Sequence, residues 1–421
     1  MHQYIALIIF ILAYTGFVVF PKRRDVTGMT ASLLLVITGV ISLPQAFQLV
    51  NWNVMGVFFG TLVVSELFLH SRMPNFLGEW IVNLAGSARG AVLLICLITG
   101  FISIGVENIA TVLIIAPIAW SIIDKLKIPP IPVIIAIAIS SNLQGAATLI
   151  GDPPSMLLAG YKKMNFNDFF FYEGKPSIFF AIEIGTAASF FVLVWIFRKY
   201  KSKMEKIPYT KIKYWTPTII LTLMILGLAL SSLVDPDFVW LAGVLCMISA
   251  FISILWILWA DKPFLKGIHK LLDWNSTFFL IGVFIIVGSL SEVGWIDRIA
   301  GGLGAIVGDS VLASYLIIIG LSLICSSFID NVPFLLTMIP VADKLAAQLS
   351  INPMLLLFGL LIGACLGGNI TPIGASANIV AMGLLRKRGY HVKFREFMEV
   401  GIPFTLVAVT AGAIFVWIVW R

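Results

Sequence analysis

Charged residues are scarce in this chain of 421 residues. Lys, Arg, Asp and Glu together make up 12% of it, while hydrophobic residues make up 60%. Soluble domains carry about 25% charged residues, and a soluble fold of this length could not bury so much apolar surface. A soluble protein is therefore excluded, and the lipid bilayer must be the solvent for most of the chain.

Cysteine and histidine are also scarce, with four of each. Cys96, Cys246, Cys325 and Cys365 lie singly inside apolar segments, so neither a disulfide framework nor metal-ligand spacing is present. The dispersed histidines give no support to a metalloenzyme, and no Ser-His pairing within the spans indicates an intramembrane enzyme. The net charge of +7 does not indicate nucleic-acid binding, because the basic residues lie in short loops. No strongly polar tail indicates a partner protein.

Long apolar runs are what the sequence does contain. A membrane-spanning helix needs about 20 apolar residues. Runs of this kind lie at residues 4–20, 28–50, 178–197, 217–234 and 401–420. We interpret the first run as a span and not as a cleaved signal peptide, because it is long and has few basic residues ahead of it.

The chain contains an internal duplication. Three separated blocks recur at an offset of 222 or 223 residues. The recurring blocks are NWN at 51–53 with DWN at 273–275, EN at 107–108 with DN at 330–331, and GAATLIGDPPS at 145–155 with GNITPIGASAN at 368–378. A proline follows ten positions after each acid of the second block, at Pro117 and Pro340. This agreement predicts two homologous halves.

The fold class that follows is an all-α integral membrane protein with two inverted repeats. We assign residues 1–197 to the first repeat, 198–216 to a basic cytoplasmic linker and 217–421 to the second repeat. Each repeat is predicted to contain five spans plus one re-entrant helical hairpin, and one of its spans is broken. In the first repeat the segments are 4–20, 28–48, 53–70, hairpin 90–123, broken span 130–160 and 177–197. In the second they are 217–233, 237–260, 275–291, hairpin 311–343, broken span 353–384 and 401–420.

The hairpins are predicted to be re-entrant because each apolar arm is about 14 residues long, too short for a full crossing. Five crossings per half invert the second half relative to the first. Loops 21–27, 71–89, 124–129, 198–216, 261–274 and 385–400 then share one side, which holds 22 of the 28 basic residues. The positive-inside rule makes that side cytoplasmic and places both termini on the non-cytoplasmic side of the cell membrane. No basic residue is left inside the membrane.

The two broken spans are the first candidate for a binding site. Broken helices in each repeat expose backbone carbonyls that can hold a cation and helix N-termini that can hold an anion. The breaks extend from Asn142 to Pro154 and from Gly367 to Ser376, with Asn, Thr and Ser residues clustered in them. The alternative is a kinked helix of small residues that serves packing alone.

Intramembrane acids are the second candidate. Glu107 and Asp330 lie at the hairpin tips and Asp152 lies in the first break, while all basic residues are assigned to loops. Ionisable groups in a span are costly and are functional candidates by default. These carboxylates therefore need a bound cation, a proton or water at a re-entrant tip, and Asp152 has a further alternative as a helix N-cap. Glu66 and Glu183 lie in apolar spans outside the repeated blocks, and we leave them open between function and packing.

Four segments carry a resemblance to a known family. GVENIATVLIIAP at 105–117, SSNLQGAATLIGDPPS at 140–155, SSFIDNVPFLLTMIP at 326–340 and GACLGGNITPIGASAN at 363–378 are similar to signature blocks of the ion transporter superfamily. They most resemble the branch of arsenite permeases, NhaD-type sodium/proton antiporters and the P protein. The resemblance covers nearly the whole chain. It implies two re-entrant hairpins, a homodimer and a transport domain that moves like an elevator against a scaffold.

The resemblance and the breaks together define the candidate ion and substrate site. Its residues are Glu107, Asn108, Asn142, Thr148, Gly151, Asp152, Ser155, Asp330, Asn331, Asn369, Thr371, Gly374, Ser376 and Asn378. Asn108, Thr148, Asn331 and Thr371 are the candidate Na⁺ ligands among them. Ser155 stands where this branch usually has Asn, so one amide is missing. Neither hairpin carries the Ser-Asn-Thr of the superfamily's dicarboxylate carriers, which argues against a dicarboxylate substrate.

We therefore predict a secondary active transporter that is coupled to Na⁺ or H⁺, with Na⁺/H⁺ antiport or proton-coupled efflux favoured. No other cofactor is expected, and the partners are the transported ion or solute, membrane lipid and a second copy of the chain. One alternative is Na⁺-coupled uptake of a small organic or inorganic anion, which would be held by helix N-termini because no Arg is available. The other alternative is an ion channel, but no pore-lining repeat of acids is visible.

Overall fold

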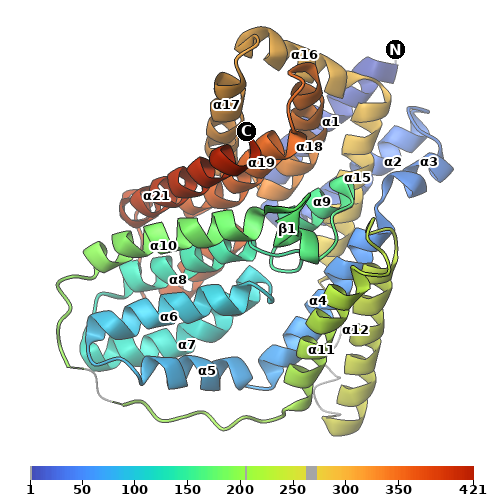
Figure 1. Cartoon of the computed structure of the whole chain (residues 1–421). Helices are drawn as coiled ribbons and strands as arrows, with labels where there is room; N and C mark the ends of the chain where they lie inside the picture. Colours follow the sequence, from blue (N-terminus) through green and yellow to red (C-terminus); the bar gives the residue numbers. More distant parts are fainter. Residues whose placement is uncertain (1, 204–205, 262–272) are drawn as a thin grey trace.

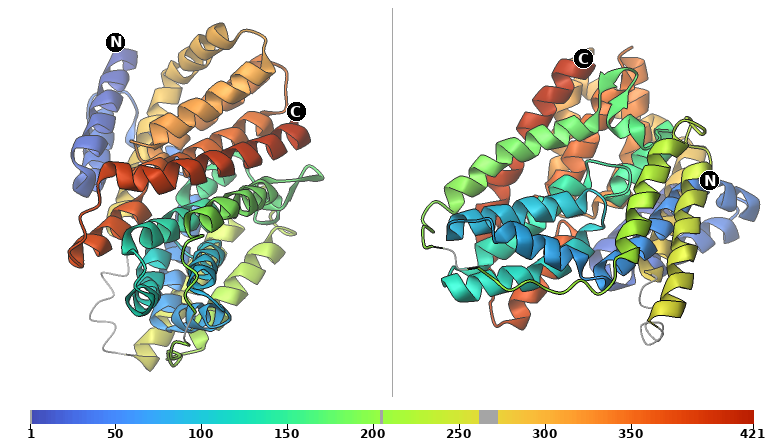
Figure 2. Two further views of the ribbon diagram at one scale, coloured as in Figure 1. Left: turned by 90° about the vertical axis from the view of Figure 1, so that its left-hand side faces the viewer. Right: turned by 60° about the horizontal axis from the view of Figure 1, so that its bottom comes forward.

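The computed structural model describes residues 2–203, 206–261 and 273–421, and most of these residues are in helices (Figures 1 and 2). Two of the predicted regions extend outside this part of the chain. They are linker positions 204–205 and most of the predicted basic loop 261–274, which includes Lys262, Lys266 and Lys270. Among the described residues, eight helices are long and apolar enough to cross a membrane. The chain is thus a multi-pass membrane protein.

The helices of the first half follow the predicted segments closely. They are α1 His2–Val19, α2 Arg24–Ile37, α3 Leu43–Leu49, α4 Trp52–His70, α5 Met73–Val82, α6 Ala88–Ser103, α7 Asn108–Leu126, α8 Pro130–Gly145, α9 Pro153–Lys162 and α10 Ile178–Ile196. Short 3₁₀ turns lie at Pro21–Arg23 and Asn167–Phe169, and the strands β1 Phe171–Tyr172 and β2 Lys175–Pro176 form a small antiparallel hairpin.

The helices of the second half repeat this order. They are α11 Thr216–Ser231, α12 Leu241–Ala260, α15 Trp274–Glu292, α16 Trp295–Val307, α17 Val311–Ser326, α18 Asn331–Gln348, α19 Pro353–Gly367, α20 Ser376–Lys387 and α21 Phe394–Trp420. A 3₁₀ turn, Gly368–Ile370, continues α19.

The predicted single span 28–48 is wrong. The structure ends α2 at Ile37 and begins a separate helix, α3, at Leu43. Gly39 has a φ of 71°, in the left-handed region that favours glycine, and this ends α2. Ser42 then forms a capping box with Gln45, which starts the new helix ahead of Pro44. A hydropathy profile alone does not detect this turn, because its residues are mostly apolar.

Both predicted hairpins are present as pairs of packed helices, α6 with α7 and α17 with α18. Helices α6 and α17 each have 16 residues, α7 has 19 and α18 has 18. These lengths include polar residues beyond the apolar arms, such as Asp124 and Lys125 near the end of α7. Of the four helices, only α7 is long and apolar enough to count as a candidate span. Whether the hairpins re-enter one membrane face stays a prediction.

Helices of the first half pack against helices of the second. Helix α4 packs along α12, and α2 packs along α15. Both contacts are close at glycines: a Cβ on Gly56 would lie 2.9 Å from the Cα of Gly243, and one on Gly282 would lie 2.7 Å from the carbonyl carbon of Gly28. The last helices of the halves, α10 and α21, lie side by side through the middle of the molecule (Figures 1 and 2). Helices from before and after the linker thus pack against each other in three pairs.

The linker between the halves follows the edge of α5 and α6. Its backbone accepts hydrogen bonds from Ala88 and Arg89 of α6, at Ser202 (2.8 Å) and Tyr200 (2.9 Å). Beyond residues 204–205, Asn83 exchanges hydrogen bonds with the backbone of Ile207 at 2.9 and 2.8 Å. The described part of the linker is thus a bound segment and not a loose tether.

Candidate functional site

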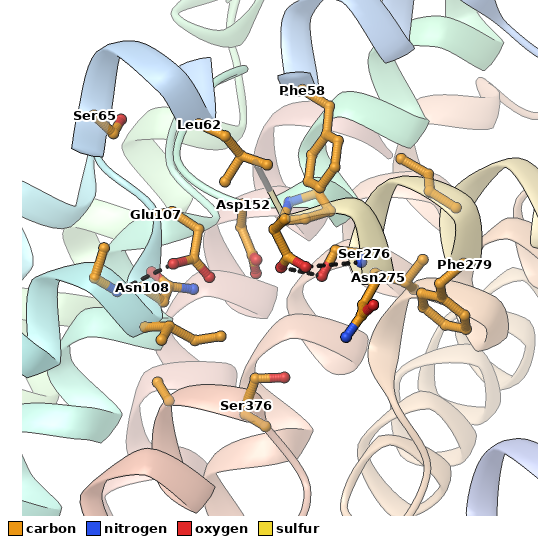
Figure 3. Close-up of a pocket in the computed structure, with 18 of the residues that line it drawn as sticks. Phe58, Leu62, Ser65, Glu107, Asn108, Asp152, Asn275, Ser276, Phe279 and Ser376 are labelled. Carbon is orange, nitrogen blue, oxygen red and sulfur yellow. Dashed lines mark hydrogen bonds between the residues drawn. The ribbon is translucent and has the colours of Figure 1, made fainter. Parts of the chain in front are cut away.

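A cavity of about 1160 Å³ lies between the two halves, and Figure 3 shows part of its wall. Six helices, α2, α7, α9, α15, α18 and α20, begin at this cavity, while α4 lines one of its sides. Seven predicted site residues line it: Glu107, Asn108, Asn142, Asp152, Asp330, Asn331 and Ser376. Because the first N–H groups of a helix lack helical partners, these helix starts bring donors and partial positive charge to this space.

Glu107 and Asp152 are the carboxylates at the first hairpin and the first break. Both side chains point into the same part of the cavity (Figure 3). Glu107 caps α7 by accepting a hydrogen bond from the N–H of Ala110 at 3.1 Å. Neither acid forms an ion pair with a residue in the described part of the chain. Two like charges that share a cavity favour uptake of a cation or a proton.

The alternative role of Asp152 as a helix cap is not supported. Asp152 occupies the N-cap position of α9, with extended dihedral angles, but its side chain makes no capping hydrogen bond within the described structure. Two features explain this: Pro154 at the second helical position has no N–H, and the N–H of Ser155 at the third donates to the backbone carbonyl of Asp152 at 3.1 Å. The carboxylate is therefore left to face the cavity.

Asp330 at the second hairpin tip has a cationic partner, which contradicts the prediction that every basic residue lies in a loop away from the acids. The guanidinium of Arg24 donates a hydrogen bond to the Asp330 carboxylate, which also accepts from the N–H of Val332 at 3.1 Å. Arg24 is the first residue of α2, and Lys22 two positions earlier also lines the cavity. The prediction that no Arg is available for an anion is wrong for the same reason.

A tyrosine joins the first helix to the second hairpin. The Tyr14 hydroxyl on α1 lies 2.5 Å from the carbonyl oxygen of Pro333 and 2.6 Å from Oγ1 of Thr337. Both partners are on α18, one and two turns after Asp330. With the Arg24 ion pair, this contact ties the second hairpin to α1 and α2.

The two breaks are built alike. Thr148 donates its hydroxyl to the carbonyl of Ile104 at 2.5 Å, and Thr371 donates to the carbonyl of Ser327, 223 residues further on. Each hydrogen bond ties a break to the end of the preceding hairpin helix. A Cβ on Gly374 would lie 2.7 Å from the carbonyl oxygen of Gly368, and Gly151 approaches Gly145 in the same way. These residues hold the breaks together behind the cavity and do not line it.

Buried amides link the breaks of the two halves. Asn142 donates to the side-chain oxygens of Asn369 at 2.8 Å and Asn378 at 3.0 Å. Asn378 in turn donates to the carbonyls of Gly368 and Thr371, at 2.9 and 3.0 Å. Ser155, at the equivalent place in the first half, reaches only the carbonyl of Ala146, at 3.2 Å. Because Ser155 has no amide, it makes fewer hydrogen bonds across the first break than Asn378 makes across the second.

Asn108 has a structural contact that the sequence did not predict. Its side-chain oxygen accepts from Ser103, and its backbone carbonyl accepts from Ser141 at 3.3 Å. A Cβ on Gly145 would collide with the Asn108 amide, so only glycine lets the hairpin tip contact α8 at this point. Asn108 therefore joins hairpin and break while one of its edges still borders the cavity.

Sequence reasoning missed several residues that line the cavity: Lys22, Arg24, Asp25, His70 and Asn275. The signal available was the cluster KRRD at 22–25, directly between two spans, which charge counting treated as a loop. Glu66 and Asp273 also line the cavity. Asp273 caps α15 by accepting from the N–H of Ser276 at 3.0 Å. Among the described residues, no three His, Cys, Asp or Glu side chains are grouped to hold a metal ion.

The fold and the site define a membrane transporter, and comparisons with known proteins agree. The profile of the citrate transporter family (CitMHS) matches residues 5–363. The chain belongs to this family, which is part of the ion transporter superfamily.

Relatives and solved structures extend the agreement over the whole chain. An uncharacterised transporter of Mycobacterium tuberculosis is 27% identical over 98% of both chains. The human P protein is 24% identical over 93% of this chain and 57% of its own length, which confirms the predicted branch. The YdaH transporter of Alcanivorax borkumensis (TM-score 0.57, 15% identity) covers 92% of this chain and 87% of its own. MtrF of Neisseria gonorrhoeae (TM-score 0.61, 13% identity) covers 92% and 84%. These two structures share the fold.

Proposed function

We propose that the protein is a secondary active transporter that couples a small ion or solute to Na⁺ or H⁺, with Na⁺/H⁺ antiport or proton-coupled efflux favoured. The observation that carries this proposal is the pair Glu107 and Asp152. The two carboxylates face one cavity from different elements, without an ion pair in the described part of the chain. A coupling ion that binds there removes the repulsion between them, and its release restores it.

The construction of the breaks supports an alternating-access mechanism of the elevator type. Each hairpin is hydrogen bonded to its break through Thr148 or Thr371, so hairpin and broken helix would move as one unit. Asn108 and Asn331 remain candidate Na⁺ ligands because they line the cavity. Thr148 and Thr371 lie behind it, and their hydroxyls could bind Na⁺ only at a buried position next to the breaks, with the lone pairs that their donated hydrogen bonds leave free. The ion and the solute are the only bound groups that this scheme requires, and it involves no enzymatic step.

The membrane orientation and the assembly are part of the same proposal. We place the linker 198–216 in the cytoplasm and both termini on the opposite side of the cell membrane. Figure 1 is consistent with this placement, because the N terminus and the linker lie at opposite ends of the molecule. We take the functional unit to be a homodimer in lipid, as the resemblance implies.

The direct test is flux in proteoliposomes loaded and diluted to set Na⁺ and pH gradients separately. Glu107→Gln and Asp152→Asn should each abolish coupled flux, because either change removes half of the cation site. Glu399→Gln is the matched control, since this carboxylate is 61% exposed and its one ion pair among the described residues is with Arg395, one turn away. Wild-type flux in the Glu107→Gln, Asp152→Asn double variant would overturn the proposal. Flux without counter-transport would indicate a channel instead.

A second function, Na⁺-coupled uptake of a small anion such as a carboxylate, is favoured by one observation. Arg24 and Lys22 line the cavity together with six helix N-termini, so positive charge is available there. The family description, which names citrate, points to the same chemistry. Arg24→Gln should abolish anion uptake and leave Na⁺/H⁺ exchange in place. Uptake of citrate or a dicarboxylate that survives this substitution would show that Arg24 does not hold the anion, and wild-type protein that takes up neither would exclude this second function.

A further inference from the structure

Glu183 lies outside the cavity, on the apolar helix α10, and contacts the last turn of the broken helix α8. The side-chain nitrogen of Gln144 on α8 donates to Oε2 of Glu183 at 3.3 Å and to Oγ1 of Thr186 at 3.0 Å. Gln144 is followed by Gly145, which contacts the first hairpin tip at Asn108. The group therefore lies behind the first break, on the side away from the cavity.

The hydrogen bonds determine which way the Gln144 amide faces. The Thr186 hydroxyl donates its one hydrogen to the carbonyl of Ile182 at 2.8 Å, so it can only accept from Gln144. The Gln144 atom beside Thr186 must accordingly be the nitrogen, and the amide oxygen must lie on the other side. Both hydrogens of the Gln144 nitrogen are then used, one for Thr186 and one for Glu183.

Two side-chain oxygens of this group lack a hydrogen-bond donor. Oε1 of Glu183 and Oε1 of Gln144 are buried and have no hydrogen-bond partner among the described residues. Two acceptors cannot satisfy each other, and a buried acceptor without a donor costs about 1–3 kcal/mol, more if it is charged. One proton on Oε1 of Glu183 resolves both, because a carboxylic acid and an amide pair through O–H···O and N–H···O bonds at once. The second of these bonds is already present.

No nearby charge offers Glu183 an alternative partner. Helix α8 contains no titratable residue. On the other helices packed against α10, the titratable or charged residues are Arg89 and Cys96 of α6, and Arg395, Glu396 and Glu399 of α21. None of them forms an ion pair with Glu183 in the described residues. A carboxylate in a membrane-spanning helix without a cation is costly, whereas a neutral acid is not.

We infer that Glu183 is a proton-binding site, paired as a neutral acid with the Gln144 amide, that anchors the broken end of α8 to α10. Loss of this proton would leave two buried acceptor oxygens without a donor and would weaken the contact between α8 and α10 next to the first break. The site is separate from Glu107 and Asp152, and it does not depend on their role in transport.

Infrared spectroscopy of the purified protein in lipid nanodiscs tests this inference without any transport assay. The wild type at neutral pH should show the carbonyl stretch of a protonated carboxylic acid, and Glu183→Gln should lose it. The variant should fold, because a second amide can form the same pair with Gln144. Glu66→Gln, which changes another acid within an apolar helix, is the control and should keep the band. Gln144→Leu should keep the band but shift it, since the acid loses its partner.

Three results would overturn the inference. An identical spectrum for wild type and Glu183→Gln would mean that Glu183 is ionised. A band that Gln144→Leu leaves in place without a shift would mean that the acid is not paired with the amide. Loss of the band on addition of Na⁺ at constant pH would make this a cation site and not a proton site.

Discussion

The ion pair between Arg24 and Asp330 gives the sharpest quantitative prediction for the cavity. Its two side chains are 21% and 13% exposed, so the pair is largely shielded but borders the cavity. Hydrogen bonds between charged groups contribute about 1.5–3 kcal/mol, and a fully buried pair costs about 3–5 kcal/mol when one partner is removed. Because water can enter the cavity, we expect the lower end, a coupling energy of about 1.5–2 kcal/mol. This is roughly a 10- to 30-fold effect on the unfolding equilibrium.

A double-mutant cycle measures this coupling. Arg24→Gln, Asp330→Asn and the double variant are compared by equilibrium unfolding in mixed micelles, and the double variant should recover part of the stability lost in Arg24→Gln. The pair Arg395 and Glu399 is the matched control, because its side chains are 89% and 61% exposed. Exposed pairs one helical turn apart are worth only about 0.3–0.5 kcal/mol.

The reasoning would be refuted by additive effects of the two substitutions at Arg24 and Asp330. A coupling no larger than that of the control pair would lead to the same conclusion. Either result would mean that the Asp330 carboxylate is solvated as an isolated tip residue. The prediction from the sequence, that Asp330 has no cationic partner, would then hold.

The remaining predictions concern the break, a loop and the membrane orientation. Gly374→Ala should destabilise the protein by about 1–3 kcal/mol, because its Cβ would lie 2.7 Å from a carbonyl oxygen across the break. Gly383→Ala is the control and should not destabilise the protein, because a Cβ there would lie in open space. Equal unfolding free energies for the two variants would contradict the close packing at Gly374. Burial raises the pKa of Asp168, in the loop after α9, from 3.8 to about 6. The folded state therefore binds the proton more tightly, and the stability of the wild type relative to Asp168→Asn should fall as pH rises from 3.8 to about 6. A flat difference in a pH series of thermal melts would argue against this. Cysteines introduced at the exposed positions Lys175 and Lys211 should react with an impermeant reagent from the outside and the cytoplasm respectively; labelling from the same side would exclude the proposed orientation.

Most of the fold was predictable because the bilayer imposes strong rules on a sequence. Apolar runs mark helices that must satisfy their own backbone hydrogen bonds, and this located both hairpins and both broken spans. The exception, 28–48, shows the limit of that signal. A capping box at Ser42 and a left-handed Gly39 ended one helix and began another inside a continuous apolar run. At this position local hydrogen bonding set the helix boundaries, and a hydropathy profile does not detect hydrogen bonds.

The candidate site was predictable as a set of residues but not as a set of roles. The repeated blocks identified both breaks, yet the structure divides their residues into those that border the cavity, such as Asp152, and those that hold the backbone, such as Thr148. A hydroxyl in a broken helix can serve either purpose, and only the position of the neighbouring carbonyl decides which. The amide bridge from Asn142 to Asn378 spans 236 residues of chain, and no local pattern predicts such a contact.

The sequence by itself determined that this is a membrane protein of duplicated helical halves with acids near its breaks, because composition and repetition can be read without knowing any distance. The tertiary structure decided which of those acids have partners. Arg24 reaches Asp330 because α2 packs along α15 of the other half and brings its first residue to the second hairpin tip. Glu107 and Asp152 have no such neighbour among the described residues. Charge compensation depends on distances of a few ångströms between segments far apart in the chain, and only the packing of the two halves sets those distances.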